Sequence, residues 1–154
     1  MRRWTCLLLA VLAVLFCTAC GGAAANGAKS VQIEKRLAED GTVLYTLTDP
    51  ETIEALRDSL SVEYEEKDIV PLPEDAAALY IYTISQTETL KLGQKAEDLK
   101  MVPILRYTIY KDADLLTEEI LPGEMEGVPL MEDLLRCTFQ VKAETAQFLR
   151  EYAP

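Results

Sequence analysis

Segments in which apolar and polar residues alternate recur along this chain from residue 31 onward, and they constrain its fold more than any other feature. Successive side chains of a β-strand point to opposite faces of a sheet, so alternation indicates strands with one buried face. The pattern predicts strands over residues 31–37, 43–47, 78–86, 88–92, 103–111, 115–121 and 134–141. A half-buried sheet is therefore expected to form most of the folded part.

Turn and capping signals connect the first two of these segments to each other and to a helix. Asp40 and Gly41 lie between them, and Asp-Gly in that position is typical of a hairpin because glycine accepts positive φ. Asp49 then stands at the expected N-cap and Pro50 at the first helical position. The apolar residues that follow recur at helical spacing, namely Ile53, Leu56 and Leu60.

A second helix is predicted over residues 142–152, with Ala146, Leu149 and Tyr152 on one face. Because helices do not alternate regularly with strands along the chain, the order favours an α+β fold over a parallel α/β fold. We expect a mainly antiparallel sheet of about five to seven strands with two helices packed on one face.

The N-terminal residues have the composition of an export signal that ends in a cysteine. Arg2 and Arg3 form a positive n-region, and residues 6–16 form an apolar stretch too short to span a bilayer stably. Residues 17–22, Cys-Thr-Ala-Cys-Gly-Gly, resemble the lipobox of bacterial lipoprotein precursors, in which small residues precede the lipidated cysteine. The resemblance implies that the chain is cleaved before Cys20 and that Cys20 carries the lipid, a palmitate-type membrane anchor. The sequence departs from the usual lipobox at Cys17, where the family usually has leucine or another aliphatic residue.

This segment has two other interpretations. A signal peptide without lipid attachment would be cleaved near the three alanines at 23–25 and would remove Cys20. A retained transmembrane helix is disfavoured by the short apolar stretch and by the small residues after it.

The lipoprotein interpretation divides the chain into a signal peptide at 1–19, a flexible tether at 20–30 and a single α+β extracytoplasmic domain at 31–154. The mature protein would lie at the extracytoplasmic face of the cell membrane, held by its lipid. The motif Thr-Asp-x-x-x-Ile-x-x-Leu at 48–56 is also similar to small lipoproteins of Gram-positive bacteria, a resemblance that implies no particular activity.

The net charge argues against two classes of partner. The chain has 15 basic and 26 acidic residues, and loss of Arg2 and Arg3 with the signal would leave 13 basic residues and a net charge of −13. So acidic a domain is unsuited to nucleic acid or to adsorption on anionic lipid, both of which require basic patches. The charge favours solubility and attraction to a cationic partner.

Histidine and cysteine usage argues against several kinds of catalysis. The chain has no histidine, which excludes Ser-His-Asp hydrolysis and disfavours zinc sites. Of the four cysteines, only Cys137 would remain unmodified after processing, so no intramolecular disulfide is expected in the mature lipoprotein. Cys137 lies in an alternating segment and is predicted to be a small core residue. We expect no cofactor and no metal site.

Other candidate sites come from carboxylates and tyrosines. Four acidic residues cluster after the first helix and could in principle bind a divalent cation, although a solvated loop explains them as well; they are Glu63, Glu65, Glu66 and Asp68. Four tyrosines on the predicted strands form the candidate interaction face, since tyrosine is enriched at interfaces; they are Tyr80, Tyr82, Tyr107 and Tyr110. The alternative is that these tyrosines simply cover the sheet.

These observations predict a membrane-anchored extracytoplasmic domain that binds another envelope or secreted protein and catalyses no reaction. One alternative is a sensor domain for a small molecule or a cell-wall fragment, which would require an apolar pocket with a few polar groups. Another is a carboxylate-dependent hydrolase, which would require two close carboxylates with opposed protonation.

Overall fold

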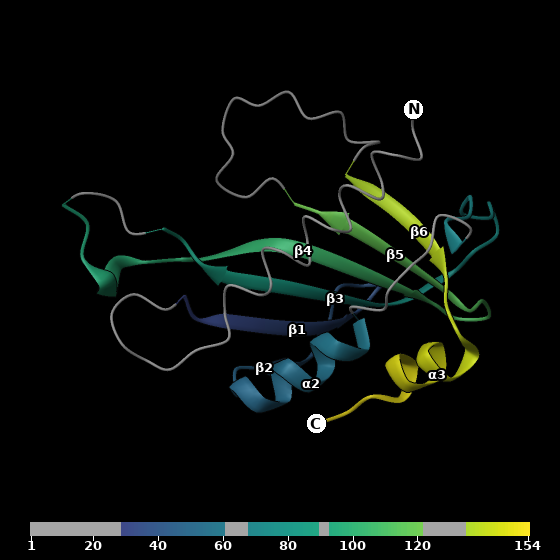
Figure 1. The fold of residues 1–154 in the computed structure, drawn as a ribbon, viewed down its shortest axis with the longest axis horizontal. Coiled ribbons are helices and arrows are strands. Elements are labelled where there is room, and N and C mark those ends of the chain that lie inside the picture. The colour runs from purple at the N-terminus through teal and green to yellow at the C-terminus, as the bar shows by residue number, and fades with distance from the viewer. Residues whose placement is uncertain (1–28, 61–67, 90–92, 122–134) are drawn as a thin grey trace.

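The computed structural model describes residues 29–60, 68–89, 93–121 and 135–154. They form one six-stranded sheet in the order β2-β1-β3-β4-β5-β6, and every pair of neighbouring strands is antiparallel (Figure 1). The strands are β1 (Val31–Leu37), β2 (Val43–Leu47), β3 (Ala78–Thr87), β4 (Met101–Tyr110), β5 (Leu115–Ile120) and β6 (Arg136–Gln140). The helices are α2 (Pro50–Leu60) and α3 (Ala143–Glu151), with a short 3-10 turn, η2, at Ala96–Asp98. The predicted α+β fold is confirmed.

Local signals produce the first hairpin and the helix after it. Gly41 adopts φ +74°, and the Asp40 carboxylate accepts a hydrogen bond from the Thr42 N–H at 2.9 Å. At the start of α2, Asp49 Oδ2 accepts hydrogen bonds from the Thr52 N–H at 2.9 Å and from the Thr52 hydroxyl at 2.6 Å. Asp49 therefore caps the helix as its position predicts.

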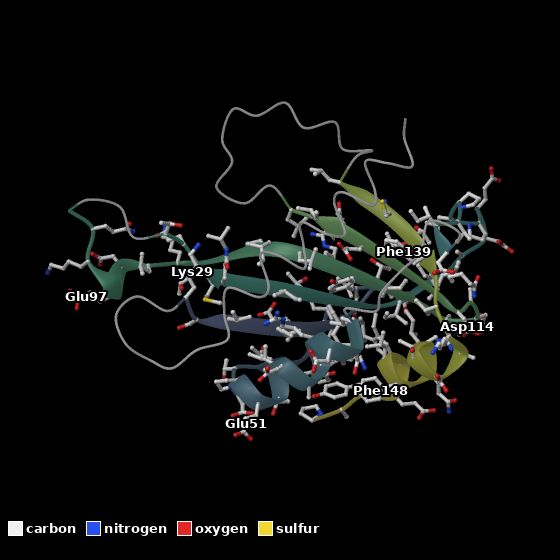
Figure 2. All side chains as sticks on the ribbon, in the orientation of Figure 1. Lys29, Glu51, Glu97, Asp114, Phe139 and Phe148 are labelled. Carbon is white, nitrogen blue, oxygen red and sulfur yellow. The ribbon has the colours of Figure 1, made fainter. Side chains whose placement is uncertain are left out.

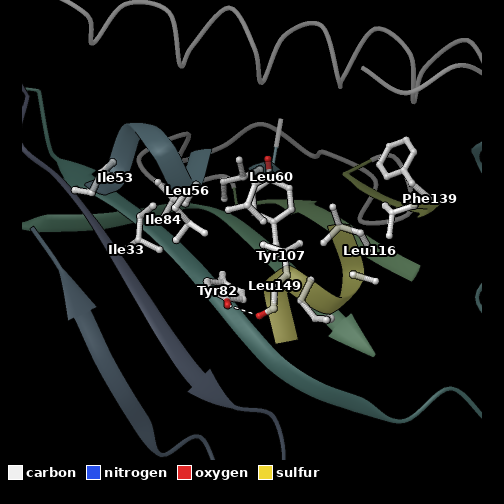
Figure 3. Packing of buried hydrophobic residues seen from close by; sticks show 14 of the residues in the cluster. Ile33, Ile53, Leu56, Leu60, Tyr82, Ile84, Tyr107, Leu116, Phe139 and Leu149 are labelled. Carbon is white, nitrogen blue, oxygen red and sulfur yellow. Dashed lines mark hydrogen bonds between the residues drawn. The ribbon is translucent and has the colours of Figure 1, made fainter. Parts of the chain in front are cut away.

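Both helices pack against the same face of the sheet. The buried residues of α2 and α3 belong to one cluster with the inward side chains of the strands. Ile33 and Lys35 are two residues apart on β1 and so point to the same face; Ile33 lies beneath Leu56 of α2, while Lys35 contacts the end of α3 (Figure 3). The sheet has two edge strands, β2 and β6. Ile69 bridges to Phe139 of β6, whereas no described segment pairs with the outer edge of β2.

The prediction of a separate strand over 88–92 is wrong at Glu88 and Thr89. Strand β3 runs as far as Thr87, and Glu88 N–H then donates to the Lys100 carbonyl at 2.9 Å, so the chain is already returning toward β4. Strand β4 begins at Met101, earlier than predicted, with Pro103 at a register shift beyond the end of β5. Proline has no N–H to donate to a neighbouring strand, and within sheets it is found at such irregular positions.

The predicted signal peptide, with Cys20, and nearly all of the tether lie outside the described residues. Within the part of the chain that the structure describes, no helix has the length and hydrophobicity needed to cross a membrane.

Candidate functional site

The four tyrosines do not form the exposed interaction face that the sequence suggested. Tyr82, Tyr107 and Tyr110 are at most 3 % exposed, and Tyr80 is partly buried against the core. Tyr82 and Tyr107 are cross-strand neighbours on the face that the helices cover. Tyr110 follows a register shift in β4 and shares a hydrogen bond of 2.7 Å with the buried Thr117 hydroxyl. The alternative interpretation, in which these tyrosines cover the sheet, is the correct one.

Sequence reasoning missed a row of polar side chains that crosses the sheet beneath the helices. Strand pairing places each member opposite the next, and we call this set the polar row: Tyr45, Lys35, Tyr82, Tyr107, Glu118 and Cys137. Alternation could have revealed it, because Lys35 follows Ile33 by two residues and Glu118 lies between Leu116 and Ile120 at the same spacing.

Lys35 holds the end of α3 from within the core. Lys35 is 2 % exposed, and its Nζ donates hydrogen bonds to the carbonyls of Leu149 at 3.3 Å, Arg150 at 3.2 Å and Tyr152 at 2.8 Å. An ammonium has three donors, and the last carbonyls of a helix have no partner within the helix. The positive charge also faces the negative end of the helix dipole. Lys35 therefore acts as a structural cap.

Tyrosine rings surround the same ammonium. Nζ of Lys35 lies 4.1 Å from the ring centre of Tyr80, 5.3 Å from that of Tyr82 and 5.7 Å from that of Tyr45. The Tyr82 hydroxyl donates to the Leu149 carbonyl at 2.6 Å (Figure 3), and the Tyr45 hydroxyl donates to the Tyr152 carbonyl at 3.0 Å.

Burial shifts the pKa values of this cluster. Desolvation lowers the pKa of Lys35 from 10.5 to about 8 and raises that of Tyr45 from 10.0 to about 12. It also raises the pKa of Tyr82. The tyrosines therefore stay neutral donors at neutral pH, and the enclosed ammonium is unsuited to reaching a substrate.

Glu118 is the buried carboxyl of the polar row. It is 8 % exposed, and desolvation raises its pKa from 4.5 to about 7, an effect that a hydrogen bond from Tyr107 partly opposes. Among the described residues it is the only buried carboxyl, so they do not contain the close pair of buried carboxyls that the hydrolase alternative predicts.

Cys137 pairs with Glu118 across β5 and β6 and is buried, as its alternating segment predicts. Its sulfur is disulfide-bonded in this structure. The expectation of no intramolecular disulfide concerns the mature lipoprotein without its signal peptide, and it stays a prediction. The other cysteines of the chain, at positions 6, 17 and 20, lie outside the described residues.

The described residues contain no group of three or more His, Cys, Asp or Glu side chains placed to hold a metal ion. Of the four clustered acidic residues, Glu63, Glu65 and Glu66 lie outside the description and Asp68 lies within it.

Exposed apolar side chains occur on β2 and on α3, and aromatic rings contact each other where β2 meets the end of α3. Val43 and Leu44 of β2 are 43 % and 45 % exposed, and Phe148 of α3 is 42 % exposed. The ring of Tyr152 lies between those of Phe148 and Tyr45, with its centre 5.4 Å from that of Phe148 and 6.0 Å from that of Tyr45. We call these five residues the β2-edge patch. Leu72 and Met101 are exposed apolar residues outside it.

Exposed acidic residues lie at both ends of β2. Glu39 and Asp40 occupy the turn before the strand, and Asp49 and Glu51 begin the helix after it. Figure 2 shows Glu51 and Phe148 on the side of the sheet where the helices lie. Strand β2 thus carries exposed apolar residues between two acidic ends, and the β2-edge patch is the part of the described molecule best suited to contact another protein.

Comparison with protein-family models, with curated proteins and with solved structures finds no match for this chain.

Proposed function

We propose that this chain is a membrane-anchored extracytoplasmic lipoprotein whose domain binds another envelope or secreted protein without catalysing a reaction. The β2-edge patch carries the proposal. It combines an open strand edge, exposed aromatic and aliphatic side chains and an acidic surround, features that suit a protein partner.

The state of the ionisable core groups supports binding over catalysis. Lys35 and Glu118, whose pKa values shift toward neutrality, are both enclosed, at 2 % and 8 % exposure. A perturbed pKa marks a candidate catalytic group when the residue lies in a cleft open to substrate. The ammonium of Lys35 instead donates hydrogen bonds to carbonyls at the end of α3, which is a structural role.

The membrane anchor is supported by the sequence at Cys20 and its neighbours. Metabolic labelling with an alkyne-bearing palmitate analogue is expected to tag the wild-type chain at the membrane, and Cys20→Ala is expected to lose both the tag and the membrane location. Retention of the tag by Cys20→Ala would exclude lipidation at this residue.

Protein binding is tested by photo-crosslinking in the native envelope, with the probe placed at Leu44 or Phe148 of the patch. The matched controls carry the probe at Leu72 or Met101, which are exposed apolar residues outside the patch. One dominant protein adduct from the patch positions, absent from the controls, is the expected result. Failure of all four positions to give a protein adduct would refute the binding function.

A further inference from the structure

The edge of β2 provides backbone groups as well as side chains. Only β1 pairs with β2 among the described strands, so alternate residues of β2 direct their N–H and C=O groups away from the sheet. An extended peptide can add to such an edge as a further strand, with backbone hydrogen bonds supplying affinity and side-chain contacts supplying specificity.

A bulge limits the length of regular pairing at this edge. Lys35 pairs with Tyr45 and Arg36 with Val43, which leaves Leu44 as the extra residue. Bulges and short edge strands discourage uncontrolled edge-to-edge pairing. The regular part of the edge is therefore short, running from Tyr45 to Leu47, and Leu44 beside it is turned to solvent.

Charge argues against a second copy of this chain as the occupant. Antiparallel pairing of β2 with β2 would bring the acidic turn at 39–40 of one copy beside residues 49–51 of the other, at both ends of the interface. Like charges placed opposite each other destabilise strand pairs, and the net charge of −11 adds repulsion. The same acidic ends attract a strand with basic residues at its own ends.

Resting on the binding function proposed above, we propose that the partner contributes a short extended segment that adds to β2 as a seventh strand. The segment has apolar side chains at its centre, which cover Leu44, and Lys or Arg at each end, which face Glu39–Asp40 and Asp49–Glu51. Backbone pairing fixes its direction along β2, while the basic ends select it over other extended chains.

The test uses the full chain, purified with its own N-terminus in detergent, and a displayed library of randomised nine-residue peptides as the probe. Selected peptides are synthesised and titrated by fluorescence anisotropy, and each is also made with single N-methyl groups at successive positions. Because an added strand pairs through alternate residues, N-methylation is expected to abolish binding at every second position of the pairing segment and to be tolerated between them.

Variants of the chain test the two side-chain contributions. Leu44→Lys is expected to reduce peptide affinity at least about tenfold, whereas Met101→Lys, a matched change outside the patch, leaves affinity unchanged. Glu39→Gln combined with Glu51→Gln is expected to reduce affinity about fivefold, with Glu144→Gln on α3 as the control that has no effect. Circular dichroism of each variant confirms that it is folded.

Three outcomes would overturn strand addition. The first is that the selected peptides lack basic residues at their ends, and the second is that N-methylation weakens binding without alternating between successive positions. The third is that light scattering shows a dimer of the chain that Leu44→Lys abolishes. A crosslinked protein from Leu44 in the envelope together with any of these results would leave the binding function intact and reject only this mode. Absence of adducts at every probe position would reject the binding function itself.

Discussion

Replacement of Glu118 by glutamine isolates the cost of ionising a carboxyl within the core. Glutamine has nearly the same shape and keeps an oxygen that can accept the hydrogen bond from Tyr107. It stays neutral at every pH, whereas Glu118 must ionise as the pH rises. The variant is therefore expected to be more stable than wild type at alkaline pH and close to it in acid.

The magnitude follows from linkage. Glu118 has a pKa of about 7 when folded against 4.5 unperturbed, so the folded protein binds the proton more tightly than the unfolded chain. Wild-type stability is favoured below about pH 4.5 and falls as the pH rises to about 7, above which the loss is complete. A rise of about 2.5 at about 1.4 kcal/mol per pKa unit gives about 3 kcal/mol as the upper limit. The buried amide donors of glutamine reduce this gain, and we expect about 2 kcal/mol at about pH 8.

The assay is urea unfolding followed by far-ultraviolet circular dichroism at several pH values, and the quantity compared is the difference in unfolding free energy between variant and wild type. Taking the difference cancels the other titrating groups, including Asp40 and Asp49, whose lowered pKa values make stability fall as the pH drops. Glu119→Gln is the matched control. Glu119 points to the opposite face, where it is 32 % exposed and pairs with Arg106 at 2.8 Å.

The control is expected to change stability by less than about 1 kcal/mol, with no increase in its relative stability across the same pH range. If the difference in unfolding free energy between Glu118→Gln and wild type stays constant from about pH 4.5 to about pH 8, the assignment of a raised pKa to Glu118 is refuted. A glutamine variant that is less stable than wild type at about pH 8 would show that the ionised carboxyl has a favourable partner.

Three further changes test other parts of the fold. Lys35→Met removes the ammonium that donates to the Arg150 carbonyl, and it is expected to lower the unfolding free energy by about 2 kcal/mol in urea titrations at neutral pH. An unchanged urea midpoint would contradict the capping role of Lys35. Asp49→Ala is expected to cost about 1 kcal/mol by thermal unfolding, with most of it restored by Asp49→Asn; equal losses in both variants would exclude the N-cap explanation. Leu149→Ala, in the core, is expected to lower the unfolding free energy by about 3 kcal/mol, whereas Phe148→Ala, at the neighbouring exposed position, lowers it by less than about 1 kcal/mol. Similar losses in both variants would contradict the orientation of α3.

Local sequence signals account for the elements that depend on few neighbours. The hairpin between β1 and β2 follows from Asp40 and Gly41, whose turn geometry is formed within a few residues. The start of α2 follows from the Asp49 cap in the same way. Errors arise at residues 88–89 and at the start of β4, because strand length there is set by how far β3 and β4 remain paired.

The candidate tyrosine face failed for a reason visible in the alternation itself. Tyr82 is two residues from Ile84, and Tyr107 lies between Leu105 and Ile109 at the same spacing, so both share the apolar face of their strands. Strand propensity and interface propensity both favour tyrosine, and neither says which face the helices cover. That choice depends on where α2 and α3 pack.

The sequence by itself determined the α+β class, the first hairpin, the positions of both helices and the inward residues of α2, because alternation, turn residues and caps act over short distances. Only the tertiary structure decided that β2 has a free edge among the described strands, that Lys35 meets three carbonyls at the end of α3 more than a hundred residues later, and that Glu118 lies beside Tyr107. These contacts join segments far apart in the chain, and their partners are chosen by the strand order and by the burial of a common core.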